Sequence, residues 1–171
     1  MDVLIVYRSK SGFSQRYAEE LAARLGIAAI NARKLKNADV ESAGTVVWCA
    51  GVYASRIGGI GKLRQLAAKY DKKRFFVLAV GATDDENGFY REELEKANLP
   101  GGTVKLFYAQ GGFDMERMGL FDRLIIRTVR RSLAEKTDPT DEERRMLAAV
   151  SRDGFSMDEN VLEQIKAAVI E

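Results

Sequence analysis

Histidine is absent from this chain of 171 residues. Its absence excludes imidazole general bases, Ser–His and Cys–His nucleophile pairs, and most transition-metal sites. Any chemistry must then rest on carboxylates, amines or a bound cofactor. A redox cofactor carries its own chemistry and needs the protein mainly for binding, orientation and electronic tuning. The missing histidine therefore does not limit a cofactor-dependent redox protein.

Cysteine and long apolar runs are also scarce. Cys49 is the only cysteine, which excludes an intrachain disulfide and fits a cytosolic chain. No apolar stretch reaches the roughly 18–20 residues that span a bilayer. The first residues lack the basic region and cleavage site of a signal peptide. We therefore expect a cytoplasmic protein whose residues 1–171 form a single domain.

The most informative segment lies at the start of the chain. Residues 3–7 are an apolar run of strand length, and a helical pattern with Tyr17 and Leu21 on one face begins soon afterwards. The loop between them is rich in hydroxyl groups and contains a glycine that allows close backbone approach. N–H groups at a helix N-terminus lack intrahelical partners and carry partial positive charge, so such a loop binds phosphate. The predicted phosphate-binding residues are Ser9, Lys10, Ser11, Gly12, Phe13 and Ser14.

This loop resembles the FMN-phosphate loop of flavodoxins, which reads hydroxyl-x-hydroxyl-Gly-x-hydroxyl. The three serines and Gly12 match the defining positions, while Lys10 and Phe13 occupy the variable ones. The position directly after the first strand strengthens the resemblance, because a motif gains meaning from its structural context. The alternative is an ordinary serine-rich turn between a strand and a helix.

The rest of the chain alternates apolar strand-like runs with helical patterns. Such interleaving indicates a parallel sheet covered by helices on both faces. We expect an α/β, flavodoxin-like three-layer sandwich with a five-stranded parallel sheet of order 2-1-3-4-5, and a ligand above strands 1 and 3. After the first strand, the expected strands are 27–35, 45–50, 75–80 and 103–108, and the expected helices include 59–70, 90–97 and 160–170.

The flavodoxin resemblance implies that the loops after the third and fourth strands hold the flavin ring. Tyr53 is the candidate for an aromatic that stacks on the ring, with a surface or core tyrosine as the alternative. Phe89 and Tyr90 are weaker candidates of the same kind. The residues implied to line the flavin are Ala50, Gly51, Val52, Tyr53, Ala54, Gly81, Ala82 and Thr83.

Three other features favour structural interpretations. The Gly58–Lys62 segment resembles a nucleotide loop but has Leu63 at the hydroxyl position, so it is interpreted as a helix start. Cys49 is interpreted as a small buried hydrophobe. The acidic cluster of residues 84–86 could hold a metal ion, but a solvated loop is the preferred interpretation, and we expect no metal site.

A helical insertion of about residues 110–157 follows the fifth strand. A helix is predicted over 115–135, with an apolar stripe on one side and arginines on another. From Arg117 to Lys136 there are six basic and two acidic residues, a charge of +4, while the remaining chain carries −2. The net basicity is therefore expected to reside in this helix. A second helix is predicted over 141–150, where Thr140 and Glu143 form a capping box.

The insertion sharpens the resemblance. Its segments 111–114 and 120–127 are similar to the insertion of flavodoxin-type protoporphyrinogen oxidases. Those enzymes use FMN and pass electrons from protoporphyrinogen IX to a membrane quinone. The resemblance implies an FMN-dependent, protoporphyrinogen dehydrogenase-like oxidoreductase with a redox partner or quinone. It assigns no catalytic residue. The loop after the third strand differs from the family in detail.

The basic helix has three interpretations. It packs on the domain with its arginines solvated, it contacts an anionic membrane or a redox partner, or, least favoured, it binds nucleic acid. A surface contact would place the protein peripherally on the inner face of the membrane. The implied function also keeps two alternatives, a non-enzymatic flavodoxin electron carrier and a flavin-free interaction module on the same fold. The residues expected at the partner or membrane surface are Arg123, Arg127, Arg130 and Arg131.

Overall fold

The computed structural model describes residues 2–85, 87–99, 101, 103–111, 119–151 and 157–171. The strands are β1 (Val3–Arg8), β2 (Ala29–Asn31), β3 (Thr45–Tyr53), β4 (Arg56–Ile57), β5 (Arg74–Gly81) and β6 (Val104–Gln110). The helices are α1 (Phe13–Arg24), α2 (Asn37–Ser42), α3 (Ile60–Lys69), α4 (Phe89–Asn98), α5 (Leu120–Ala134), α6 (Asp141–Ser151) and α7 (Glu159–Ile170).

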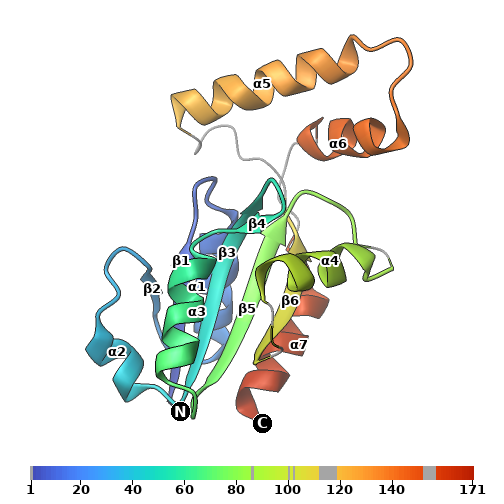
Figure 1. The fold of residues 1–171 in the computed structure, drawn as a ribbon. Coiled ribbons are helices and arrows are strands. Elements are labelled where there is room, and N and C mark those ends of the chain that lie inside the picture. The colour runs from blue at the N-terminus through green and yellow to red at the C-terminus, as the bar shows by residue number, and fades with distance from the viewer. Residues whose placement is uncertain (1, 86, 100, 102, 112–118, 152–156) are drawn as a thin grey trace.

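The main sheet is parallel and has the strand order β2-β1-β3-β5-β6 (Figure 1). The predicted order 2-1-3-4-5 is confirmed, because β4 lies off this path and only pairs with the end of β3. Tyr7, Cys49 and Leu78 lie side by side across β1, β3 and β5. This register brings the carboxyl ends of the strands to one edge, where ligands bind in open α/β sheets.

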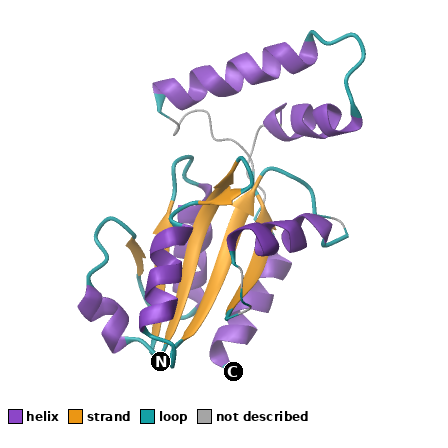
Figure 2. Ribbon diagram, in the orientation of Figure 1, coloured by secondary structure: helices purple, strands orange, loops and turns teal. Residues whose placement is uncertain are grey.

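Helices cover both faces of the sheet, as Figure 2 shows. Side chains alternate along a strand, so Trp48 faces the core beneath α2, α3 and α4, while Cys49 faces the core beneath α1 and α7. Both are completely buried. Apolar strands flanked on both sides are typical of parallel sheets. The predicted three-layer arrangement is therefore confirmed.

The second strand is shorter than predicted. The sequence suggested residues 27–35, but β2 covers only Ala29–Asn31 and pairs only with β1. The chain turns directly afterwards, where the Lys34 N–H donates to the Asn31 carbonyl at 2.8 Å. The short helix α2, which was not predicted, then begins with the Lys36 N–H donating to the Asp39 carboxylate at 2.8 Å. A short strand at the sheet edge also leaves little unpaired backbone exposed.

The insertion after β6 contains two helices that pack against each other, α5 and α6. Figure 1 shows this pair beyond the carboxyl-terminal edge of the sheet, away from the helices that cover its faces. The predicted helix over 115–135 is confirmed from Leu120 to Ala134, while residues 115–118 lie outside the described part. The capping box of α6 is confirmed by bonds of 3.0 and 3.2 Å between Thr140 and Glu143.

The apolar stripe of α5 is largely uncovered. Of the predicted stripe, Phe121, Leu124 and Ile125 are 74, 63 and 45% exposed, and the neighbouring Leu120 is 83% exposed. The later stripe residues Val129 and Leu133 are half-buried, and Met118 lies outside the described part. The interpretation in which this stripe packs on the domain therefore does not hold for the first half of α5.

One tyrosine joins the two ends of the insertion. The Tyr17 hydroxyl, on α1, donates to the Gln110 carbonyl at 3.0 Å and accepts from the Asp158 N–H at 2.8 Å. Gln110 ends β6, and Asp158 caps α7 by accepting from the Val161 N–H at 3.1 Å. Burial raises the pKa of Tyr17 to about 12. The base of the insertion is thus closed against the body of the fold.

Candidate functional site

The loop between β1 and α1 presents the start of a helix at the carboxyl edge of the sheet. Gly12 precedes α1 with a φ of 87°, a left-handed conformation that favours glycine. Its N–H donates to the Ser9 hydroxyl oxygen at 2.9 Å, and its carbonyl accepts from the Arg16 N–H at 3.0 Å. The Ser9 hydroxyl keeps its own hydrogen to donate, because it only accepts in that bond.

The electrostatics of this loop suit an anion. The first turn of α1 contains no acidic residue, so no carboxylate offsets the positive end of the helix dipole. Lys10 adds a positive charge within the loop. Ser11 is half-buried, and Ser14 is 2% exposed in the first turn of the helix. The start of α1 therefore offers hydrogen-bond donors and the positive end of a helix dipole, which are features that favour an anion.

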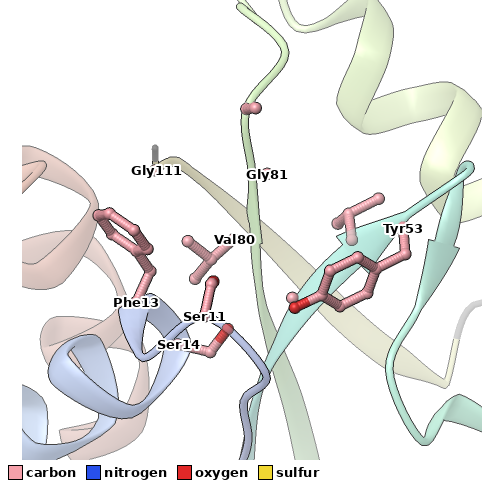
Figure 3. Close-up of a pocket in the computed structure, with 10 residues that line it drawn as sticks. Ser11, Phe13, Ser14, Tyr53, Val80, Gly81 and Gly111 are labelled. Atoms are coloured by element: carbon pink, nitrogen blue, oxygen red, sulfur yellow. The ribbon is translucent and has the colours of Figure 1, made fainter. Parts of the chain in front are cut away.

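A shallow pocket of about 30 Å³ opens to solvent beside this loop. Clefts that enclose a whole small molecule measure roughly 300–1,000 Å³, so this pocket would surround only part of such a ligand. Figure 3 shows Ser11 and Ser14 close to Val80, with the Tyr53 ring extending from β3 toward the same loop. The lining residues are Ser11, Phe13, Ser14, Gly51, Val52, Tyr53, Val80, Gly81, Ala82 and Gly111.

Tyr53 occupies one wall of the pocket and lies across Gly51. A Cβ at position 51 would approach Cε2 and Oη of Tyr53 to 2.9 Å, so any other residue there would require the Tyr53 ring to shift. The Lys10 ammonium lies 5.0 Å from the centroid of the Tyr53 ring, within cation–π range. The loop of residues 9–14 and the end of β3 therefore meet through these two side chains.

A tight hairpin after β3 holds Tyr53. Tyr53 pairs with Arg56 of β4, and the two residues between them, Ala54 and Ser55, have φ values of 47° and 59°. Two central residues with positive φ indicate a type I′ turn. Residues other than glycine cost about 1–2 kcal/mol each in this conformation. The sequence suggested only a loop here, because Ala-Ser lacks the glycine or asparagine that marks such turns.

The opposite wall comes from the ends of β5 and β6. The Tyr108 hydroxyl donates to the Thr83 carbonyl at 2.6 Å, and the Gly111 N–H donates to the Gly81 carbonyl at 2.7 Å. Burial is the main cause that raises the pKa of Tyr108, so its hydroxyl stays protonated and keeps donating. These bonds hold residues 81–83 against β6 and shape the pocket.

Eight of the predicted cofactor-binding residues line this one pocket, and six do not. Lys10 and Ala50 do not line the pocket, because Lys10 contacts the Tyr53 ring instead and Ala50 is completely buried in the sheet. The others outside the lining are Ser9, Gly12, Ala54 and Thr83. Val80 and Gly111 line the pocket but were not predicted. The sequence could have indicated Gly111, because it follows a predicted parallel strand and the carboxyl ends of such strands all meet at this edge of the sheet.

Neither of the two weaker aromatic candidates, Phe89 and Tyr90, lines the pocket. Phe89 is exposed at the start of α4, while Tyr90 packs edge-on against Tyr108 with ring centroids 5.3 Å apart. Gly59 precedes α3, which confirms a helix start at the apparent nucleotide loop. Burial raises the pKa of the Cys49 thiol, so it remains an unreactive apolar side chain.

Asp85, in the acidic loop after β5, has a structural partner. Asp85 accepts from the Arg91 N–H at 3.1 Å and so helps to start α4. Glu86 lies outside the described residues. Among the residues that the structure describes, no cluster of three or more potential ligands could hold a metal ion.

The surroundings of the pocket combine hydrogen-bond donors with apolar walls. Donors gather at the loop of residues 9–14, while Val80, the glycines and the Tyr53 ring supply apolar walls. The chain matches a family model described as a flavodoxin domain over residues 4–140, which includes every residue of this pocket. No curated protein matches the chain. Flavodoxin domains bind flavin and serve electron transfer. Because the match covers well over half of the sequence, the chain belongs to the flavodoxin family.

Proposed function

We propose that the flavin is FMN and that its phosphate binds at the loop of residues 9–14. The observation that carries this proposal is the start of α1, where the left-handed Gly12, two serine hydroxyls and an uncompensated helix dipole meet. Ser11 and Ser14 would donate to the phosphate, and Tyr53 would cover the ring from the β3 side. The flavin, when bound, supplies the electron and hydride chemistry. The protein's own groups bind it and orient it.

We further propose a protoporphyrinogen IX dehydrogenase-like activity with a quinone as electron acceptor. The support is the helical pair after β6, which lies beyond the pocket edge of the sheet and exposes apolar side chains such as Phe121 and Leu124. A porphyrinogen and a quinone are both large and apolar, so a dehydrogenase that uses them needs an apolar surface near its flavin. The pocket alone is too small to enclose such substrates.

The test is anaerobic turnover of protoporphyrinogen IX by the FMN-loaded protein with a soluble quinone analogue. We expect flavin reduction by the porphyrinogen and reoxidation by the quinone. Phe121→Ser combined with Leu124→Ser should lower turnover while FMN stays bound, because the exposed apolar surface is lost. Absence of turnover with several quinones would refute this activity.

A membrane contact through α5 is the related proposal. Arg127, Arg130 and Arg131 are exposed, Arg123 is half-buried, and Arg131 also pairs with Glu135 at 2.7 Å. Basic side chains beside an exposed apolar face favour an anionic bilayer surface. No helix in the described part of the chain is long and apolar enough to cross a membrane. The contact would therefore be peripheral, at the inner face.

Vesicle binding tests this contact. Serine at the four α5 arginines should weaken binding to vesicles containing phosphatidylserine, and salt should weaken the parent's binding, because the Debye length is only about 8 Å at physiological ionic strength. A matched control removes four exposed lysines elsewhere and should bind vesicles like the parent. The control positions are Lys69, Lys72, Lys96 and Lys105. Equal binding by all three proteins would return α5 to a structural role.

A non-enzymatic electron carrier is the second candidate. The observation that favours it is the composition of the pocket, whose lining contains no carboxylate, lysine or arginine in the described structure. A carrier needs no proton-transfer group, whereas a dehydrogenase that removes protons from carbon is helped by one. Rapid reduction by a flavodoxin reductase, together with no porphyrinogen turnover, would support the carrier.

A further inference from the structure

A second basic region lies outside the α5 helix. Residues 33–74 contain ten basic and three acidic residues, a net charge of +7. Residues 117–136 carry +4 over about half that length, and everything else carries −9. The basic charge of the chain therefore lies in two regions, of which the sequence analysis considered only the α5 helix.

Five of these basic residues are exposed on neighbouring segments, and together we call them the basic face. These segments are the turn after β2, the short strand β4 and the first half of α3. The Lys62 ammonium approaches the Ala32 carbonyl at 3.5 Å, which brings the start of α3 against the turn after β2. All five side chains are exposed. The residues of the basic face are Arg33, Lys34, Arg56, Lys62 and Arg64.

The basic face reaches the rim of the pocket. Arg56 pairs with Tyr53, whose ring lines the pocket and contacts Lys10. Arg8, at the end of β1, packs over Gly59 at the start of α3. A Cβ at position 59 would approach the Cδ atom of Arg8 to 3.0 Å. Positive side chains thus continue from the phosphate loop to α3. A flavin held in the pocket would have this surface beside it.

These charges do not serve the fold through ion pairs. In the described part of the chain, no residue of the basic face forms a salt bridge, whereas Arg24 binds three glutamates. The nearby Asp39 accepts from a backbone N–H, and Glu41 accepts from the Tyr70 hydroxyl. Unpaired like charges on one surface repel each other, so the basic face costs stability unless an anionic partner binds there.

We propose that the basic face docks the acidic surface of a soluble one-electron redox protein. Complementary charge steers such encounters and raises association rates by about 10–1,000-fold. The position beside the pocket favours a redox protein over nucleic acid, because docking there brings a second redox centre toward the flavin. The inference rests on the flavin of the proposed function and not on its porphyrinogen substrate.

A plant-type [2Fe–2S] ferredoxin, chosen for its acidic surface, is the probe. Two reduced ferredoxins, each oxidised by one electron, supply two electrons to one flavin, which also takes up two protons from water. Stopped-flow absorbance gives the second-order rate constant. We expect it to fall at least tenfold between ionic strengths of about 0.01 and 0.15 M, as the Debye length shortens from ~30 to ~8 Å.

Charge reversal then locates the docking surface. Glutamate at Arg33, Lys34, Lys62 and Arg64 should lower the rate at low ionic strength at least tenfold. Lys62 lies in the first turn of α3 and Arg64 directly after it, near the end of the helix where carboxylates favour the helix dipole, so the variant should fold and retain FMN. The control places glutamate at the lysines of the α4–β6 side and the far end of α3, with the same change in charge, and should react like the parent. These control positions are Lys69, Lys72, Lys96 and Lys105.

The outcomes separate the alternatives. A parent rate that does not fall with salt, or equal slowing by both variants, would overturn the proposal. Binding of duplex DNA or anionic vesicles that only the basic-face variant loses, with its ferredoxin rate unchanged, would assign the surface to those ligands instead. Calorimetric binding of oxidised ferredoxin needs no flavin chemistry, and porphyrinogen turnover is measured separately. Failure of either proposal can thus be distinguished from failure of the other.

Discussion

Replacing Tyr17 by phenylalanine tests how the helical insertion is held to the rest of the fold. The change removes one hydroxyl, which donates to the Gln110 carbonyl at 3.0 Å and accepts from the Asp158 N–H at 2.8 Å. The ring is fully buried and stays in place. Backbone groups left without a partner cost about 1–3 kcal/mol. Because Asp158 is only half-buried, we expect a loss of roughly 1–2 kcal/mol.

Urea and thermal unfolding measure this loss. Each kcal/mol of lost stability lowers the thermal midpoint by about 2–4 °C for a chain of this size, so the thermal midpoint should fall by roughly 2–8 °C. Tyr70→Phe is the matched control. Its hydroxyl bonds the Glu41 carboxylate at an exposed site, and its loss should change stability by no more than about 0.5 kcal/mol. Equal midpoints for the parent and Tyr17→Phe would refute the role of this hydroxyl.

The same variant gives a pH signature. Burial raises the pKa of Tyr17 from 10.0 to about 12, so the folded protein favours the neutral phenol. The stability that this shift contributes is complete below pH 10 and is lost as pH rises from 10 through about 12. The stability gap between the parent and Tyr17→Phe should therefore narrow over that interval. A constant gap would contradict a buried, neutral hydroxyl.

Four further substitutions probe the site and the hairpin beside it. Ser11→Ala and Ser14→Ala should each remove a bond to phosphate worth roughly 1.5–3 kcal/mol, which weakens FMN binding about 10- to 150-fold by fluorescence titration; unchanged affinity in both would place the phosphate elsewhere. Gly12→Val should weaken FMN binding more than either serine change, because its φ of 87° disfavours a branched side chain. Ser55→Gly should stabilise the protein by about 1 kcal/mol in urea unfolding, since its φ of 59° strains serine; a loss of stability would contradict the strained turn.

The layers of the fold were predictable because their signals are local and strong. Runs such as Phe75–Val80 are apolar at every position, as strands buried on both faces must be. The short helix α2 escaped prediction because only Val40 of its residues is buried. The β3–β4 hairpin escaped because Ala54 and Ser55 carry no turn signal. Neither element is marked by an apolar or turn pattern in its own sequence.

The site was predictable where one segment builds it. The loop of residues 9–14 is contiguous, and Ser11, Phe13 and Ser14 all line the pocket. Val80 and Gly111 come from separate strand ends, and their approach depends on how the strands align. The exposure of Phe121 also could not be predicted, because an amphipathic pattern does not tell whether its apolar side is covered.

Comparing FMN with riboflavin by titration calorimetry tests the phosphate site most directly. The two ligands differ only in the phosphate, and the loop around Gly12 supplies donors that riboflavin cannot use. We expect FMN to bind at least tenfold more tightly, a difference of about 1.4 kcal/mol or more. We also expect this preference to shrink in Ser11→Ala and Ser14→Ala. Equal affinity for the two ligands, or no binding of either, would contradict a flavin phosphate at this loop.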